Sequence, residues 1–266
     1  MKGAMVMRTV PVLMALGAIG LSLGGEAATA QGDFEWSGRL ARGQTLEIRG
    51  INGAVIASAA EGNEARVTAV KREGRRGDPD DVRIEVVEHS DGVTICAVYP
   101  SRRGENTCEP GGGRNQDNDR NDTEVQFRVL VPAGVHFSGN TVNGDVEARD
   151  LSADAYLRTV NGDIDVSTSG QAEASTVNGG ITASIGQATW DGTLSFHTVN
   201  GSIELMLPAG LAADVSAETV NGAMHTDFPL TVQGRWGPRR LSGRIGNGGG
   251  QLQLKTVNGS IRLIER

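Results

Sequence analysis

The chain has 266 residues, which is enough for one or two domains. Glycine is abundant, with 38 residues, and aromatic residues make up only 4% of the chain. This composition argues against a large helical core, and the absence of a Gly-X-Y period excludes a collagen-like chain. The formal net charge is −7, so no basic face is expected and nucleic acid is excluded as an expected partner.

The N-terminal segment has the pattern of a secretory signal peptide. Lys2 and Arg8 form a basic start, Val10–Leu23 is an apolar run, and Ala28-Thr29-Ala30 offers small residues at the positions that a signal peptidase reads. The run is shorter than the roughly 20 residues that a membrane-spanning helix needs. We therefore expect an exported chain, periplasmic or extracellular, that begins at Gln31 after cleavage and has no transmembrane segment.

The chain contains two cysteines, Cys96 and Cys108. In an exported protein an even number of cysteines favours a disulfide. The bond would tie an expected strand at Val93–Tyr99 to the segment that follows it. No second Cys or His lies at ligand spacing from either residue, so neither a metal site nor a cofactor is expected.

One tetrapeptide, Thr-Val-Asn-Gly, organises the second half and occurs six times without change. Repetition at a period of about 20 residues is typical of repeat architectures. The expected structural turn residues of the six copies are Asn143 and Gly144, Asn161 and Gly162, Asn178 and Gly179, Asn200 and Gly201, Asn221 and Gly222, and Asn258 and Gly259. The last step is about twice the others, so we expect a degraded or replaced copy between Thr226 and Gln251.

Apolar and polar residues alternate on both sides of each turn, which predicts strand–turn–strand units with one buried face. Around the fourth copy, for example, Phe196, Ile203 and Leu205 fall on this face. Asn-Gly suits such a turn because both residues tolerate a positive φ. The inward columns are uniform and the outward columns vary, which is typical of a scaffold with a free exterior.

Two all-β architectures fit this pattern. In a β-solenoid, or β-helix-like fold, the Thr-Val-Asn-Gly corners of successive coils stack and their Asn side chains form a ladder. The alternative is an antiparallel β-sandwich of Asn-Gly hairpins. A hairpin requires only Asn-Gly, so the invariant Thr-Val favours the solenoid.

Three regions are expected: a signal peptide at 1–30, an N-terminal antiparallel β region at 31–131, and a β-repeat domain at 132–266. A degenerate copy, Gly50-Ile51-Asn52-Gly53, keeps the register of the repeats inside the second region. The other strands expected there are Phe34–Leu40, Ala65–Val70, Val82–Glu88, Val93–Tyr99 and Glu124–Val131.

The polar segment 101–123 is expected to be a disordered surface loop, since apart from Cys108 it holds no residue suited to a core. Its Asp117, Asp119 and Asn121 alternate as the first ligands of a calcium loop do. The Gly and Glu that such a loop needs at its sixth and twelfth positions are absent, so a solvated loop is the better interpretation.

The six repeat copies, each followed by alternating apolar residues, resemble the putative adhesin family of bacterial exported proteins, a domain otherwise of unknown function. The segment Val129–Val135 before the first copy is similar to that family too, and the resemblance covers roughly residues 36–266. It implies repetitive β-structure at the cell envelope. No catalytic residues are recognised for the family, so it implies none here.

No catalytic motif is present in the sequence. The four histidines, at 89, 136, 197 and 225, are scattered, and the carboxylates Asp145, Asp163 and Asp165 have no counterparts in the other copies. We therefore predict a non-enzymatic, adhesin-like envelope scaffold that presents a surface to an unidentified envelope protein or polymer, or to a second copy of itself. The alternative is a carbohydrate-binding or carbohydrate-active β-helix protein, with Trp190 and Trp236 as its sugar platform.

Overall fold

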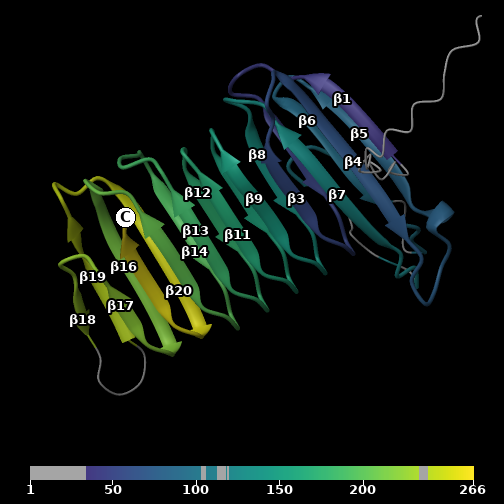
Figure 1. Ribbon diagram of the computed structural model, residues 1–266. Coiled ribbons are helices and arrows are strands. Elements are labelled where there is room, and N and C mark those ends of the chain that lie inside the picture. Colours follow the sequence, from purple (N-terminus) through teal and green to yellow (C-terminus); the bar gives the residue numbers. More distant parts are fainter. Residues whose placement is uncertain (1–33, 103–105, 113–117, 119, 234–238) are drawn as a thin grey trace, which may run out of the picture. The chain divides into compact units, whose positions relative to one another are not determined.

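The computed structural model describes residues 34–266 except 103–105, 113–117, 119 and 234–238. The expected signal peptide therefore lies outside the described residues. Apart from one short 3-10 helix, η1 (Pro79–Asp81), the elements of the described chain are strands in two mixed sheets (Figure 1). In spatial order, sheet A consists of β1 (Phe34–Arg39), β4 (Glu64–Arg72), β7 (Glu124–Val131), β3 (Val55–Ala59), β9 (Val146–Leu151), β11 (Ile164–Thr168), β13 (Ile181–Ile185), β15 (Ile203–Leu207), β21 (Ile261–Glu265) and β17 (Met224–Thr226). Sheet B consists of β18 (Thr231–Gln233), β19 (Arg239–Ile245), β16 (Ala213–Asn221), β20 (Gly250–Asn258), β14 (Thr193–His197), β12 (Ala172–Ser175), β10 (Ala155–Arg158), β8 (His136–Asn140), β2 (Thr45–Arg49), β6 (Gly92–Val98) and β5 (Arg83–His89).

The two strands that flank an Asn-Gly turn lie in different sheets. Around Asn161, for example, β10 pairs in parallel with β8 and β12 of sheet B, and β11 pairs in parallel with β9 and β13 of sheet A. Figure 1 shows the sheet A strands β9, β11 and β13 side by side. Hairpins would instead pair the two flanking strands with each other, and no such pairing occurs at the six turns. Each repeat therefore adds one parallel strand to each sheet.

The spatial order of the repeats differs from their order along the chain. The strands of the last copy, β20 and β21, lie between those of the fourth copy and those of the fifth. Asn258 accordingly pairs with both Asn200 and Asn221. Of the two expectations for the long gap, the structure agrees with the insertion: the gap contains β18 and β19, which extend sheet B in antiparallel fashion before the chain returns to fill the vacant row.

The N-terminal region contains all five strands expected before residue 132, but its pairing is mixed and not purely antiparallel. β6 pairs in parallel with β2, and β7 with β3, whereas β1, β4 and β5 pair in antiparallel fashion. The reason is that the degenerate copy at Gly50–Gly53 joins the row of repeats through a bridge between Asn52 and Asn143. Strands from both sides of residue 131 consequently share the same two sheets.

The core is built from the inward columns that the alternation predicts. Inward residues of both sheets form one continuous hydrophobic cluster. The column that follows the corners is almost fully buried, with exposed fractions of 0–2% at Val146, Ile164, Ile181, Ile203 and Ile261. Since parallel neighbours lie about 4.8 Å apart, each side chain of this column packs on its equivalent in the adjacent repeats.

Replacement of Ile203 by aspartate should test this face assignment. Ile203→Asp places a carboxylate without a partner in the apolar column, at a cost of several kcal/mol of unfolding free energy. Glu204→Gln changes the next residue, which faces outward and forms an ion pair with Arg262 (3.1 Å), so it should cost about 0–1 kcal/mol. Thermal melts of both variants provide the measurement, and a loss at Glu204→Gln as large as that at Ile203→Asp would show that the faces are assigned wrongly.

Candidate functional site

The corners, defined here as Gly50–Gly53 and the six Thr-Val-Asn-Gly tetrapeptides, carry a continuous ladder of asparagines. In each step the Nδ2 of one Asn donates to the Oδ1 of the Asn in the adjacent corner, at 2.8–2.9 Å. The ladder runs in the order Asn52, Asn143, Asn161, Asn178, Asn200, Asn258 and Asn221. These amides bond to one another along the row of corners, as expected for a stack of identical turns.

The corner threonines satisfy the glycine carbonyls. Each of the six Thr hydroxyls is buried and donates to the Gly carbonyl oxygen of the adjacent corner, at 2.8–3.0 Å. Among the described residues no backbone N–H donates to these carbonyls. The hydroxyl therefore replaces a ladder hydrogen bond at the point where the chain leaves one sheet for the other, which explains why Thr is repeated.

The corner glycines are required by close packing between repeats. A Cβ on Gly179 would overlap the carbonyl of Gly162, and a Cβ on Gly201 would overlap that of Gly179.

The expectation that Asn and Gly are needed for positive φ is wrong for most of the row of corners. In the described backbone none of the corner asparagines has a positive φ, and among the corner glycines only Gly53 and Gly144 do (115° and 153°).

The corner valines form an exposed column that hydrogen bonding does not explain. Val160, Val177, Val199 and Val220 are each 37–40% exposed. The expectation that only the inward columns are uniform is therefore wrong, because this outward column is uniform as well.

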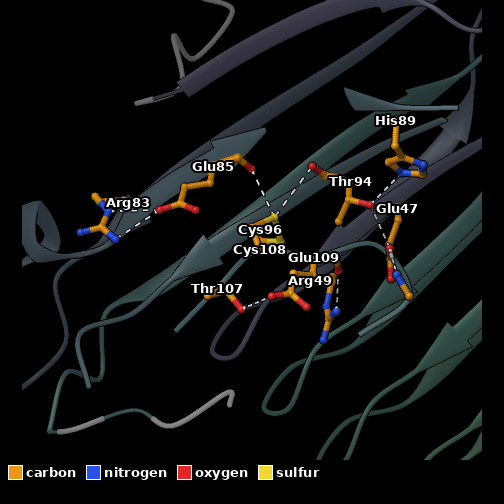
Figure 2. The surroundings of a disulfide bond; sticks show 11 residues. Glu47, Arg49, Arg83, Glu85, His89, Thr94, Cys96, Thr107, Cys108 and Glu109 are labelled. Carbon is orange, nitrogen blue, oxygen red and sulfur yellow. Dashed lines mark hydrogen bonds and ion pairs between the residues drawn. A yellow bond between two sulfur atoms is a disulfide. The ribbon is translucent and has the colours of Figure 1, made fainter. Parts of the chain in front are cut away.

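The disulfide between Cys96 and Cys108 anchors part of the polar segment 101–123 to sheet B, with the two Cα atoms 5.7 Å apart (Figure 2). Arg49 Nη1 donates to the Glu109 carbonyl (3.0 Å). The buried Glu47 accepts from Thr94 Oγ1 (3.0 Å) and from the Gly111 amide (2.9 Å). The described part of this segment is thus held to sheet B by the disulfide and these hydrogen bonds. The expected disordered loop stays a prediction, since residues 103–105, 113–117 and 119 lie outside the described ones.

The same segment offers no calcium site among its described residues. Asp117 and Asp119 lie outside them. Asn121 is buried, and its side chain donates to the Asp78 carbonyl (2.9 Å) and accepts from the Thr123 amide (3.0 Å).

The carboxylates Asp145, Asp163 and Asp165, which the sequence does not assign to catalysis, make structural contacts. Asp145 Oδ1 accepts from the Asp163 amide (2.8 Å), and Asp163 Oδ1 accepts from the Gly180 amide (2.6 Å). Asp165 lies 3.9 Å from Arg149, which pairs more closely with Glu147 (2.9 Å). Two of the three carboxylates thus hold adjacent corners together.

The four histidines lie on separate strands and do not converge. His89 contacts Thr94 (3.2 Å), His136 faces Asp154 (3.6 Å) and His225 faces Asp227 (3.6 Å). Burial and the charge of Lys255 lower the pKa of His197. Across the described residues no group of three or more His, Cys, Asp or Glu side chains is placed to hold a metal ion.

The expected sugar platform is not present as a pair of exposed tryptophans. Trp190 is only 6% exposed, and its Nε1 donates to the Gln251 carbonyl (3.2 Å). Trp236 lies outside the described residues. The exposed aromatic ring on sheet B is instead that of Tyr156, at 39%. Burial raises its pKa, and nothing in the sequence distinguished this residue in advance.

The described part of the chain has no helix with the length and hydropathy of a membrane span. Its all-β architecture of stacked, identical corners defines a repeat protein. Residues 115–263 match the Toastrack DUF4097 family, and the chain belongs to this family. The match confirms the family resemblance of the sequence.

Two solved structures are similar in fold at low identity. A putative cell adhesion protein from Clostridium sporogenes has a TM-score of 0.46 and 10% identity, with 88% of this chain and 99% of that chain covered. A putative adhesin from Bacteroides fragilis has a TM-score of 0.31 and 9% identity, with 87% and 96% covered. Both TM-scores are below 0.5, so neither structure supports an inference about function. Among curated proteins, none matches the chain.

In the middle of the ladder Asn200 makes two side-chain bonds, to Asn178 and from Asn258, whereas Asn221 at the end makes one. Asn200→Ala should lower the unfolding free energy by about 1–2 kcal/mol, and Asn221→Ala by about half as much, because an exposed hydrogen bond contributes about 0.5–1.5 kcal/mol. Urea denaturation of the two variants measures the difference. Equal losses, or none, would mean that the ladder does not contribute to stability.

Proposed function

We propose that this chain is an exported, non-enzymatic protein of the cell envelope, a β-solenoid scaffold that presents its outer faces to a protein or polymer partner in the manner of an adhesin. The observation that carries the proposal is that the invariant polar groups of the corners are occupied in hydrogen bonds within the scaffold. The Asn amides, Thr hydroxyls and Gly carbonyls of the corners bond between adjacent repeats. The repeated residues thus build the scaffold, and recognition is left to the outer faces.

The absence of enzymatic activity is supported by the carboxylates. Asp145 and Asp163 accept backbone amides of the neighbouring repeat, and an acid–base pair would need carboxylates free to exchange protons with a substrate. The residues at these positions in other repeats are Gly180 and Ser202, which carry no acid–base group. The match to the Toastrack family identifies no catalytic residue in this chain.

Export is supported by two features of different kinds. The basic, apolar and small-residue pattern of the first thirty residues is that of a signal peptide. The disulfide between Cys96 and Cys108 is stable in an oxidising compartment outside the cytosol.

The carbohydrate-active alternative is weaker. Trp190 is buried, and without it the expected platform loses one of its two rings. Sugar cleavage requires a pair of carboxylates flanking the scissile bond, and those of sheet A are engaged in backbone hydrogen bonds and ion pairs.

Expression with the native N-terminus in a secreting bacterium tests both parts of the proposal. N-terminal sequencing of the exported chain should begin at Gln31, and Leu16→Arg, which places a charge in the apolar run, should retain the protein in the cytoplasm. The exported chain should then sediment with isolated envelope fragments in a saturable manner without releasing soluble sugars or peptides. Release of fragments would show an enzyme, and failure of the folded chain to sediment would refute the scaffold function.

A further inference from the structure

The spatial order of the repeats produces a basic row that the chain order conceals. The outward residue before each corner is, along the chain, Arg49, Asn140, Arg158, Ser175, His197, Glu218 and Lys255, so one carboxylate, that of Glu218, interrupts the basic residues. The strand register places Lys255 directly beside His197 and moves Glu218 to the far end. The row from Arg49 to Lys255 therefore contains no carboxylate. A basic row is unexpected on a chain with a net charge of −7.

The ends of this row are closed by specific contacts. Glu218 lies between Lys255 and Arg240 in the register, and its carboxylate pairs with Arg240 (3.4 Å), so the basic row ends at Lys255. At the other end Arg49 lies beside Cys96 in the register and bonds to the carbonyl of Glu109. Between these ends, Arg158 and Lys255 are exposed.

Two adjoining hollows follow the basic row and share Arg158 and Ser175. The first, of about 270 Å³, has Val142 and Val160 of the valine column on its other side. The second, of about 430 Å³, lies on the outer face of sheet B and contains Tyr156 and His197. A ligand in these hollows would thus meet guanidinium and hydroxyl donors on one side and apolar surface on the other, with Lys255 on the strand next to His197.

A neighbouring carboxylate, Glu173, lies opposite Tyr156 in the register and lines the second hollow. Burial raises its pKa, against the opposing effect of Arg158. Burial likewise lowers the pKa of His197. Both side chains are half-buried in the lining of the second hollow.

The spacing of the cations suits an extended polymer. Neighbouring strands are about 4.8 Å apart, so Arg49 and Arg158, two strands apart, are separated by about 9.5 Å, and Arg158 and Lys255, three strands apart, by about 14 Å. A peptide would bind in the usual way by adding a strand to a sheet edge. Here the backbone amides are already bonded between repeats, as Val160 and Asn161 are to the Val142 carbonyl, so the free donors are side chains.

We propose that this row binds an acidic polysaccharide, with Arg158 and Lys255 on its carboxylates and the ring of Tyr156 against the apolar face of a sugar. The inference rests on the proposed function and names the partner class for one outer face of the scaffold. Arg binds carboxylates in a bidentate manner, and a tyrosine ring offers an apolar face with a polar tip.

The test measures binding of the exported chain to hyaluronan oligosaccharides, which carry one carboxylate per disaccharide, with dextran as the neutral control. The double variant Arg158→Gln/Lys255→Gln should lose at least about tenfold in affinity, because it removes two charge-assisted hydrogen bonds to the ligand. The matched control Arg149→Gln/Arg262→Gln removes the same charge from exposed positions on sheet A and should change affinity less than about twofold, since long-range effects are screened by salt.

A second pair of variants separates stacking from charge. Tyr156→Ala should weaken binding and Tyr156→Phe should retain it, since the ring and not the hydroxyl provides the contact. Equal losses in the two double variants, tighter binding of polyglutamate than of hyaluronan, or dextran binding equal to that of hyaluronan would each overturn the proposal. If hyaluronan and polygalacturonate both fail to bind while the chain still sediments with envelope fragments, the polysaccharide assignment is wrong and the scaffold function stands.

Discussion

The close approach of neighbouring corner glycines is the constraint on which the rest of the structure depends. At each corner the backbone leaves one sheet and enters the other, so the regular ladder of β hydrogen bonds is interrupted. The glycine backbones lie so close that a Cβ would overlap the carbonyl of the next corner. This proximity allows the Thr hydroxyl to reach that carbonyl and the Asn amide to reach its neighbour. The tetrapeptide is therefore a single packing unit whose polar groups are satisfied only when another copy lies beside it.

Because the six Thr-Val-Asn-Gly corners use the same Thr, Asn and Gly contacts, any two of them can be neighbours. The last copy of the chain lies between the fourth and the fifth, and the degenerate copy around Asn52 begins the row. Stacking of identical corners thus does not fix the order of the repeats. Both ends of sheet B, and the end of sheet A at β1, are formed by antiparallel strands. Terminal elements that differ from the repeats are expected in such proteins, since they limit end-to-end association.

Much of this fold could be predicted from the sequence, because alternation and turn chemistry are local. The strands and the buried column that includes Ile203 follow from residue spacing. The Asn ladder follows from the solenoid, the favoured one of two architectures, and the disulfide follows from the even number of cysteines in a chain expected to be exported. The spatial order of the repeats could not be predicted, because the alternation of inward and outward residues along each strand is the same whichever repeats are neighbours. The role of the corner glycines is not local either: the atom that excludes a Cβ at Gly179 belongs to Gly162 in the preceding repeat, not to the turn itself.

The candidate surface could not be predicted from the sequence, because it depends on the spatial order of the repeats. Along the chain Glu218 separates His197 from Lys255, whereas in space it lies beyond both. Nothing in the sequence marks Tyr156 as a binding residue, because a single tyrosine at an outward strand position is ordinary. Trp190, a candidate for the sugar platform in the sequence, is buried against β20, the sheet B strand of the last repeat. Function on such a scaffold therefore depends on which outward residues the stacking brings together.

The central claim is that glycine is needed at the corner because the neighbouring repeat leaves no room for a side chain. The most direct test is the unfolding free energy of Gly179→Ala compared with Gly62→Ala, whose Cβ would meet no atom within 4 Å. We predict a loss of about 2–3 kcal/mol for Gly179→Ala, as for overpacking of a close contact, and a change within about 0.5 kcal/mol for Gly62→Ala. Equal stability of the two variants would contradict the account.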